Sequence, residues 1–357
     1  MTVRDARPGS PPYDDAARTY DAVLVMSFGG PDGPDDVMPF LENVSRGRNI
    51  PRERLEEVAG HYMHLGGASP LNAQNRALIA ALEQELRRAG HDLPVYFGNR
   101  NWRPFVAETL RGMRDDGIRR AAVFVTSGFS CYSGCRQYRE DLWRARETVA
   151  GAPELDKLRV FYNHPGFIEA NADHLRAALD AVPPARRDRV HVAFTAHSIP
   201  LAQARHSAYV QQLQETARLV ADAAGAPSWQ VVYQSRSGPP AVPWLEPDIL
   251  DHLDALAAGG ATDVVVHPVG FLSDHMEVVF DLDHDARARA EALGVRLVRA
   301  ATVGIHPVFV RMIRELLEER MTAAPERRST GACPPNHDWC PAGCCLRGAP
   351  ARPEAPG

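Results

Sequence analysis

The sequence repeats one alternation from Tyr20 to about residue 321: a short run of β-branched and apolar residues, a turn, and an amphipathic stretch. The runs occupy residues 21–28, 93–99, 121–127, 158–163, 189–198, 229–235, 262–272 and 295–300. Leucines at helical spacing, as in 71–90, fill the stretches between them. Apolar strands that alternate with helices are typical of parallel sheets covered on both faces. The pattern predicts an α/β protein with two Rossmann-like, doubly wound parallel-sheet domains, which the length favours over one closed barrel.

The composition of each segment suggests where the domains begin and end. We expect a polar, disordered N-terminus over residues 1–19, a first α/β domain over 20–165 and a second over 166–306. A helix over 307–322 is expected to pack back onto the first domain. A tail rich in cysteine, proline and glycine follows at 323–357.

Charge and hydropathy exclude several classes of protein. The 45 acidic and 40 basic residues give a net charge of -5, which argues against binding nucleic acid through a general positive field. No apolar run approaches the roughly 18 residues of a membrane-spanning helix, so we expect no integral membrane contact. The first residues lack the apolar segment of a signal peptide, and we therefore expect a cytoplasmic protein.

Two residues that follow strand runs are candidates for chemistry, because doubly wound sheets bind ligands at the carboxyl ends of their strands. His197 ends the run 189–198, and Glu277 lies just past the run 262–272 among apolar neighbours. A carboxylate among apolar neighbours loses hydration, so it needs a polar partner, a bound metal ion or a raised pKa. A histidine and a glutamate facing each other suit a divalent ion or a pair of proton acceptors. Asp281 and Asp285 follow Glu277 at helical spacing, and a solvated acidic face is the alternative interpretation for the outer carboxylates.

The cysteines are unevenly placed, since four of six lie in the last 25 residues. These are Cys333, Cys340, Cys344 and Cys345, whereas Cys131 and Cys135 lie far upstream. Zinc or an iron–sulfur cluster explains a cysteine-dense tail with few apolar residues better than cytosolic disulfides do. Incidental cysteines in a disordered tail are the alternative. A fourth ligand from Cys131 or Cys135 would clip the tail to the first domain.

At this point the residues resemble the ferrochelatase family over about residues 20–322 and into the tail. The motifs that carry the resemblance are AHSIP at 196–200, PVGFLSDHMEVVFDLD at 268–283, MSFGGP at 26–31, GGASPLNAQ at 66–74 and QSRSGPPAVPWLEPD at 234–248. The resemblance implies the class II chelatase fold, with a porphyrin cleft between two Rossmann-like domains. It implies Fe²⁺ as the substrate metal and the lyase activity of haem biosynthesis that inserts it into a porphyrin.

The resemblance also implies roles for single residues. His197 matches the histidine that contacts iron and accepts pyrrole protons, Glu277 matches its carboxylate partner, and Asp281 and Asp285 match an acidic line leading outwards through a helix that includes a wide turn. The matches for porphyrin contacts and the pocket wall are Ser69, Tyr138, Phe28 and Trp244. Some relatives carry a tyrosine that ligates iron where this chain has Phe28, so any axial ligand here is expected to be His197.

Some relatives hold a [2Fe–2S] cluster with one internal and three tail cysteines, which implies Cys135, Cys333, Cys340 and Cys345 or Cys344 as ligands. Residues 60–75 contain no strongly hydrophobic insertion, which favours a soluble bacterial-type enzyme. Together with the matches at Ser69 and Tyr138, this favours coproporphyrin III as the substrate. Arg46, Arg48 and Arg100 are candidates to meet its carboxylates.

Three alternatives stay open: a protoporphyrin IX ferrochelatase, a chelatase that inserts cobalt or nickel into a sirohydrochlorin, and a haem or metal carrier without turnover. We expect a monomer that hands its product to the next enzyme of the haem pathway.

Overall fold

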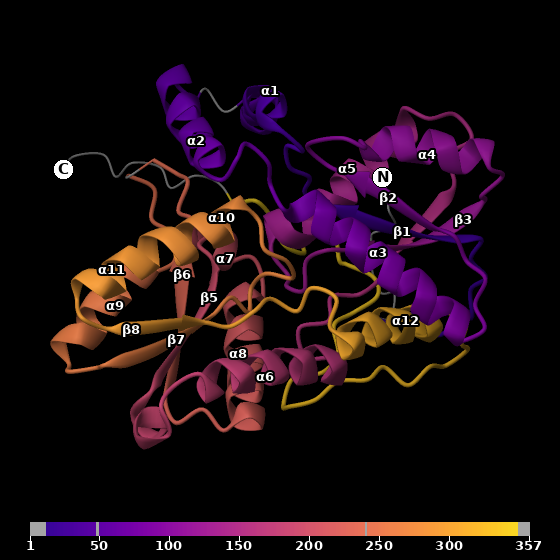
Figure 1. Cartoon of the computed structure of the whole chain (residues 1–357). Coiled ribbons are helices and arrows are strands. Elements are labelled where there is room, and N and C mark those ends of the chain that lie inside the picture. The colour runs from indigo at the N-terminus through magenta and orange to yellow at the C-terminus, as the bar shows by residue number, and fades with distance from the viewer. Residues whose placement is uncertain (1–11, 48–49, 240, 349–357) are drawn as a thin grey trace, which may run out of the picture.

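Two four-stranded parallel sheets form the centre of the computed structural model, which describes residues 12–47, 50–239 and 241–348 (Figure 1). The first sheet has the order β2-β1-β3-β4 and the second has the order β6-β5-β7-β8. Their strands are β1 (Ala22–Ser27), β2 (Val95–Asn99), β3 (Arg120–Val125), β4 (Glu154–Lys157), β5 (His191–His197), β6 (Trp229–Gln234), β7 (Asp263–His267) and β8 (Arg296–Arg299). The two strand orders are equivalent. In each sheet the chain adds the second strand on one side of the first strand and the third strand on the other side, as in doubly wound folds. The predicted fold class is confirmed.

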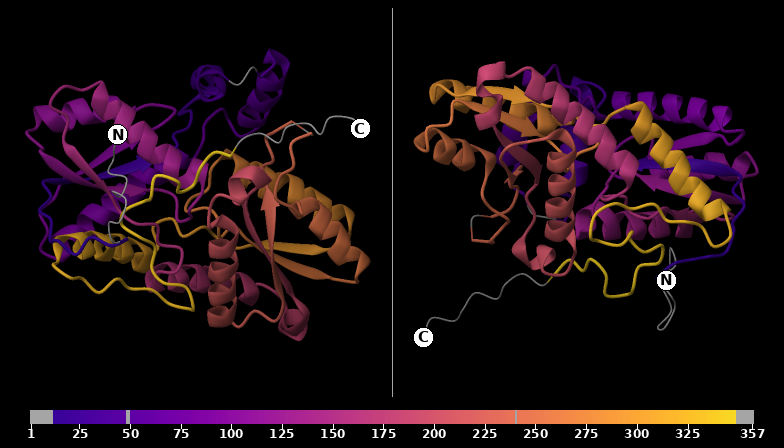
Figure 2. Two further views of the ribbon diagram at one scale, coloured as in Figure 1. Left: turned by 180° about the vertical axis from the view of Figure 1, so that it is seen from behind. Right: turned by 90° about the horizontal axis from the view of Figure 1, so that it is seen from below.

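Helices cover the faces of both sheets and fill the space between them (Figures 1 and 2). They are α1 (Pro34–Ser45), α2 (Arg52–His64), α3 (Leu71–Arg88), α4 (Val106–Asp115), the π-helix η1 (Tyr132–Arg136), α5 (Gln137–Glu147), α6 (Pro165–Asp180), the 3₁₀-helix η2 (Pro184–Arg189), α7 (Leu201–Ala204), α8 (Tyr209–Ala224), α9 (Ile249–Ala258), α10 (Met276–Val278), the π-helix η3 (Val279–Ala286), α11 (Arg287–Ala292) and α12 (Pro307–Met321). No helix within the described ranges is both long and apolar enough to cross a bilayer.

The fourth strand lies elsewhere than the sequence predicted. The apolar run 158–163 is buried but is not a strand, and the polar segment Glu154–Lys157 before it pairs with β3 instead. An edge strand has one neighbour and one partly wet side, so it tolerates the polar residues of this segment. The apolar run leaves the sheet and is buried between the two halves of the molecule.

Helix α12 joins the two halves. Its Phe309 ring packs against Phe124 of the first sheet and Phe167 of α6, within one apolar core that includes residues of both sheets. Arg314 of α12 also pairs with Glu85 of α3 at 2.9 Å. This position agrees with the expectation that the helix packs back onto the first half.

The segment 12–19 contacts both α12 and the C-terminal tail. Residues 12–19 were expected to be disordered, but the Tyr13 hydroxyl donates to the Pro335 carbonyl at 2.8 Å and Asp14 pairs with Arg320 of α12 at 2.8 Å. Residues 1–11 and the end of the tail, 349–357, lie outside the described residues. Residues 12–19 therefore find hydrogen-bonding and ionic partners in the tail and in α12, which their own local sequence does not reveal.

Candidate functional site

His197 and Glu277 face each other where the second sheet reverses its winding. His197 is the last residue of β5, and Glu277 lies in α10, which follows the neighbouring strand β7. The Nε2 atom of His197 lies 3.7 Å from Oε2 of Glu277, with 32% and 48% of the two side chains exposed. The pair is therefore accessible to a ligand at the position that doubly wound folds use for binding.

Hydrogen bonds fix how the His197 ring presents itself. Its Nδ1 donates to the Ser198 carbonyl, because a carbonyl oxygen can only accept. The neutral ring then keeps its proton on Nδ1, and the lone pair of Nε2 points toward Glu277. The Tyr209 hydroxyl donates to the His197 carbonyl at 2.9 Å and holds the end of the strand. The geometry presents a nitrogen lone pair and a carboxylate oxygen to one point.

The pair is electrostatically coupled. Burial lowers the pKa of His197, but the Glu277 carboxylate outweighs this and raises it from 6.5 to about 8. Burial raises the pKa of Glu277, but the charge of His197 brings it to about 2. Near pH 7 the two groups therefore form an ion pair, with the proton on His197 and the negative charge on Glu277.

The neighbouring His275 side chain caps α10. Its Nδ1 accepts a hydrogen bond from the Glu277 backbone N–H at 3.2 Å and lies 3.9 Å from the Glu277 carboxylate. Burial lowers the pKa of His275, so the ring is neutral near pH 7. Sequence reasoning did not assign this residue, although it stands two positions before Glu277.

Asp281 lies one turn beyond Glu277, in the π-helix η3, so the segment does contain a wide turn. The Ser235 hydroxyl and Gln234 Nε2 donate to the Asp281 carboxylate. Burial raises the pKa of Asp281 to about 7, and the charge of Glu277 adds to the rise. Asp285 lies further along, 40% exposed, and pairs with His284 at 2.8 Å. The carboxylates therefore run from the site to the surface along one segment.

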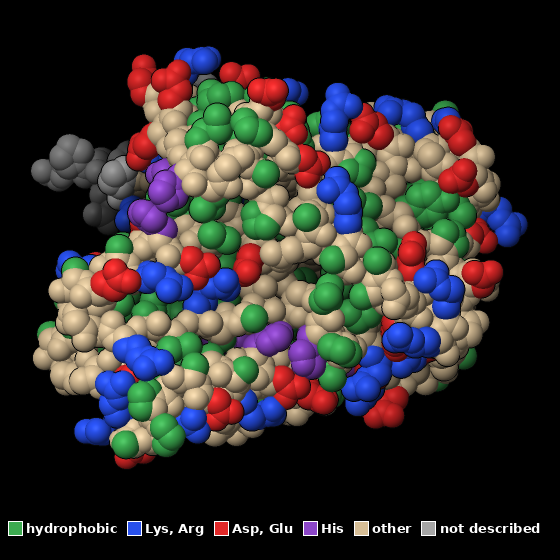
Figure 3. All heavy atoms as spheres, in the orientation of Figure 1, with side chains coloured by type: hydrophobic (Ala, Val, Ile, Leu, Met, Phe, Trp, Pro, Cys, Tyr) green, Lys and Arg blue, Asp and Glu red, His purple; other side chains and the backbone are tan. Residues whose placement is uncertain are grey.

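The α1–α2 hairpin lies over this region, and the sequence pattern did not reveal it. Tyr62 of α2 is buried with Met276 in one apolar cluster, and the charge of Glu277 adds to the burial that raises the pKa of Tyr62. The His61 ring stacks on Phe280 of η3 with 3.9 Å between ring centroids. In the space-filling view, hydrophobic side chains gather on the hairpin, and the middle of this face is hollowed below it (Figure 3). The hairpin thus encloses the site from the first half of the chain.

Phe28 and Trp244, two of the residues expected at the porphyrin, are accessible. Phe28 follows β1 and is 39% exposed, with its ring 6.4 Å from that of Phe40 in α1. Trp244 is partly buried, and its indole lies so close to Gly238 that a Cβ on that glycine would come within 2.5 Å of the ring. Both rings come from loops at the carboxyl ends of strands.

Ser69 and Tyr138 are more enclosed. Ser69 is 6% exposed and lies against Gly30 in the loop after β1, where its backbone N–H donates to the Pro31 carbonyl at 2.8 Å. Tyr138 of α5 is 4% exposed, with the Arg100 guanidinium 4.5 Å above its ring. Arg100 in turn pairs with Asp141 at 2.6 Å. Arg48, another expected carboxylate partner, lies outside the described residues.

The tail places most of its cysteines beside the first half. The Cys135 thiol lies in η1, close enough to the thiols of Cys340 and Cys345 that they lower its pKa. Cys344 Sγ lies 3.5 Å from Cys345 Sγ and 3.8 Å from Nε2 of His337. By contrast, Cys333 Sγ lies 3.8 Å from Gln211 Nε2 of α8.

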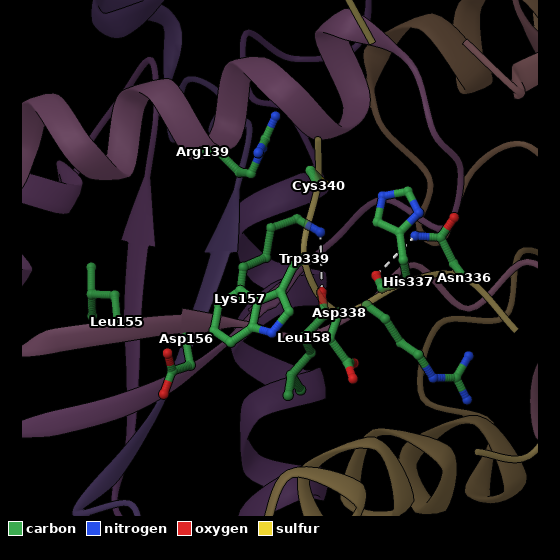
Figure 4. A pocket seen from close by; sticks show the side chains of 11 residues that line it. Arg139, Leu155, Asp156, Lys157, Leu158, Asn336, His337, Asp338, Trp339 and Cys340 are labelled. Carbon is green, nitrogen blue, oxygen red and sulfur yellow. Dashed lines mark hydrogen bonds between the residues drawn. The ribbon is translucent and has the colours of Figure 1, made fainter. Parts of the chain in front are cut away.

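Donor atoms of His337, Cys340 and Cys344 all lie within 4.8 Å of one another, so this part of the tail contains a possible metal site. A small pocket beside it is lined by β4 and by residues 336–340, with His337 and Cys340 at one end (Figure 4). Cys131 instead caps η1, accepting from the Gly134 N–H at 3.1 Å.

A comparison with protein families matches residues 20–321 to the ferrochelatase family. The chain belongs to the ferrochelatase family. A ferrochelatase of Rhodopirellula baltica is 54% identical over 340 residues, which cover 95% of this chain and 96% of the relative. A protein of Nocardia farcinica named coproporphyrin III ferrochelatase is 52% identical over 349 residues, covering 94% of this chain and 98% of the relative.

Among solved structures, SirB of Bacillus subtilis with Fe³⁺ is similar in fold, with a TM-score of 0.52 at 12% identity, covering 85% of this chain and all of that one. Membership of the ferrochelatase family makes this chain a metal chelatase of haem biosynthesis, with iron as the metal that it handles. The resemblance inferred from the sequence motifs is confirmed.

Several residues that contact the candidate site were not found by sequence reasoning. Tyr62, Tyr209 and Gln234 each contact or influence His197, Glu277 or Asp281. Gln234 could have been found, because it ends a strand beside the strand of His197. Tyr62 and Tyr209 could not have been found, because the sequence around each of them does not show which strand end its side chain approaches.

Proposed function

We propose that this chain inserts Fe²⁺ into coproporphyrin III to give Fe-coproporphyrin III. Relatives named coproporphyrin III ferrochelatase, at 50–53% identity and over nearly their whole length, support the choice of substrate. The four propionates of coproporphyrin III require a polar cleft edge, whereas protoporphyrin IX carries two. The exposed Phe28 and partly buried Trp244 provide apolar surface for the flat ring.

The observation that carries the proposal is the separation of 3.7 Å between His197 Nε2 and Glu277 Oε2. A first-row divalent ion binds imidazole nitrogen and carboxylate oxygen at about 2.1 Å, so one ion can contact both atoms at an angle of about 120°. The pair is therefore proposed as the transient ligand set of the incoming iron. Since Phe28 has no oxygen, we propose that any axial ligand is His197.

Insertion releases the two N–H protons of the porphyrin, and the iron stays Fe²⁺. We propose that the lone pair of neutral His197 Nε2 accepts these protons in turn, and that the Glu277 carboxylate stabilises the charged ring. General-base help of this kind contributes roughly 10²–10⁴-fold to a rate. Asp281, whose pKa is about 7, is suited to exchange protons near neutral pH, and Asp285 passes them to solvent.

We propose that Ser69 and Tyr138 contribute at the porphyrin edge. Ser69 lies at the loop after β1 and suits a propionate contact. Tyr138 is covered by Arg100, so it acts by orienting that guanidinium toward carboxylates.

We further propose that the tail holds a [2Fe–2S] cluster, for which the sequence predicted Cys135, Cys333, Cys340 and Cys345 or Cys344 as ligands. The donor set fits such a group, because the Cys340 and Cys345 thiols lie close enough to Cys135 to lower the pKa of its thiol, and Cys344 Sγ lies 3.5 Å from Cys345 Sγ. Lys157 and Arg139 place positive charge near Cys135, which favours its thiolate. Bound there, the cluster would clip the tail to the first half and supply a site for one-electron chemistry.

Initial rates of Fe²⁺ insertion under anaerobic conditions test the proposal, with coproporphyrin III and protoporphyrin IX compared at matched concentrations. We expect the higher kcat/KM with coproporphyrin III. Equal or better turnover of protoporphyrin IX would overturn the substrate, and faster cobalt or nickel insertion into sirohydrochlorin would overturn the reaction. A single stoichiometric binding event without multiple turnovers would identify a carrier. The cytoplasmic location, the monomeric state and the hand-over of product stay predictions.

A further inference from the structure

The tail site contains a nitrogen donor that the four-cysteine pattern does not include. His337 Nε2 belongs to the group of donor atoms, with Cys340 Sγ and Cys344 Sγ, that lie within 4.8 Å of one another. Its distance to Cys344 Sγ is 3.8 Å. Around one tetrahedral ion, metal–ligand bonds of about 2.0 Å and 2.3 Å separate nitrogen from sulfur by about 3.5 Å. The ring is thus close to a ligand position without any change of the backbone.

The spacing along the chain agrees with this arrangement. His337 precedes Cys340 with two residues between them, a separation at which two side chains commonly chelate one metal centre. Cys345 has a positive φ of 54°, which a residue with a side chain rarely adopts. That turn brings the two adjacent thiols within 3.5 Å of each other beside Cys135. Strained backbone of this kind is common where a ligand set is assembled.

Cys333 occupies a different environment. Its backbone carbonyl accepts from Asn163 Nδ2 at 2.8 Å, and its thiol lies beside Gln211 of α8. The neighbouring Tyr162 hydroxyl donates to the Pro334 carbonyl at 3.0 Å and anchors the same stretch. These contacts hold Cys333 between α8 of the second half and the buried segment 158–163, whereas His337 lies beside Cys340 and Cys344.

We infer that His337 is a nitrogen ligand of the tail metal centre, in the place that a four-cysteine set would assign to Cys333. The remaining ligands are Cys135, Cys340 and one thiol of the Cys344–Cys345 pair. The inference rests on the cluster proposed above and makes its ligand set three sulfur atoms and one nitrogen. A neutral imidazole in place of a thiolate removes one negative charge, so the oxidised cluster is easier to reduce than a four-thiolate one.

The test uses the full chain purified anaerobically, with ¹⁵N-labelled histidine, as wild type and as the variants H337C, H337A and C333S. Pulsed electron paramagnetic resonance of the reduced cluster should show a histidine ¹⁵N coupling in the wild type and in C333S. The coupling should vanish in H337C, which keeps a cluster at a lower midpoint potential. H337A should lose at least about tenfold in metal affinity, while C333S keeps the iron and sulfide content of the wild type.

Other outcomes overturn the inference. One is a wild-type cluster that shows no coupling to histidine nitrogen. A second is loss of the cluster in C333S while H337A retains it fully. A third is a wild-type protein that binds no metal. If the wild-type protein is colourless and holds zinc, X-ray absorption at the zinc edge must show one nitrogen ligand, and H337C must show a sulfur ligand in its place. Zinc bound only by sulfur in the wild type would refute His337 as a ligand. Porphyrin metallation is measured separately, so its failure in a protein with an intact cluster would count against the proposed reaction alone.

Discussion

Replacing Glu277 by glutamine should lower the pKa of His197 from about 8 to 6.5 or below. In the native protein the Glu277 carboxylate outweighs the burial that lowers this pKa. The glutamine removes the charge and keeps the size of the side chain, so the effect of burial remains. The rise from 6.5 to about 8 corresponds to about 2 kcal/mol of interaction. The contribution of the pair to folding stability is smaller, about 1 kcal/mol, because water around the half-exposed Glu277 screens it.

The change has a direct consequence for the state of the site. At pH 7 a group with a pKa of about 8 is neutral in about one tenth of the molecules, whereas a pKa of 6.5 leaves about three quarters neutral. Native insertion should therefore rise with pH through about 8, because only neutral His197 accepts a proton or binds iron. In E277Q this rise should move to pH 6.5 or below, at a lower maximal rate because one metal ligand is gone.

The interaction also contributes to stability. Since the folded pKa of His197 lies above its unfolded value, the contribution is fully present below pH 6.5 and is lost as the pH rises through about 8. E277Q should lose this dependence across the same window.

The assay is a titration of the histidine ring signals by nuclear magnetic resonance, with His197 assigned through a His197→Gln variant. D285N is the matched control, because Asp285 pairs with His284 and its loss should leave the pKa of His197 near 8. A His197 pKa that stays near 8 in E277Q would refute the electrostatic account. An equal fall in D285N would show that the general acidity of the segment, rather than the facing carboxylate, sets the value.

Three further outcomes are expected. His197→Ala should keep the fold by circular dichroism and abolish iron insertion, and near-normal insertion by the folded variant would remove it from the mechanism. Glu319→Gln should destabilise the protein by about 3–5 kcal/mol in chemical unfolding, because it breaks a bidentate pair with Arg159 whose side chains are 7% and 1% exposed; a loss below about 1 kcal/mol would contradict this. Gly238→Ala should displace Trp244 and raise the KM for porphyrin severalfold with little change in kcat, whereas an unchanged KM and indole fluorescence would exclude Trp244 from the pocket wall.

Hydrophobic patterning was sufficient for most of the sheets, because seven of the eight expected runs overlap a strand of the structure. A parallel strand is covered on both faces, so its burial is visible in the sequence as an unbroken apolar run. The exception was β4, whose edge position made its sequence polar, while the apolar run beside it is buried between the halves. Here an edge strand has a polar sequence and a segment buried between the halves has an apolar one. Only long-range contacts show which of the two is the strand.

Local sequence was enough to predict the α/β class, the family, and His197 and Glu277 as candidates that follow strand runs. These follow from local periodicity and from motifs in which neighbouring residues act together. The tertiary structure decided what depends on residues far apart in the chain. The 3.7 Å between the paired side chains, the α1–α2 hairpin over the site and the position of His337 beside Cys340 and Cys344 are of this kind. Spacing along a chain limits which residues can meet, but packing of the whole molecule selects which of them do.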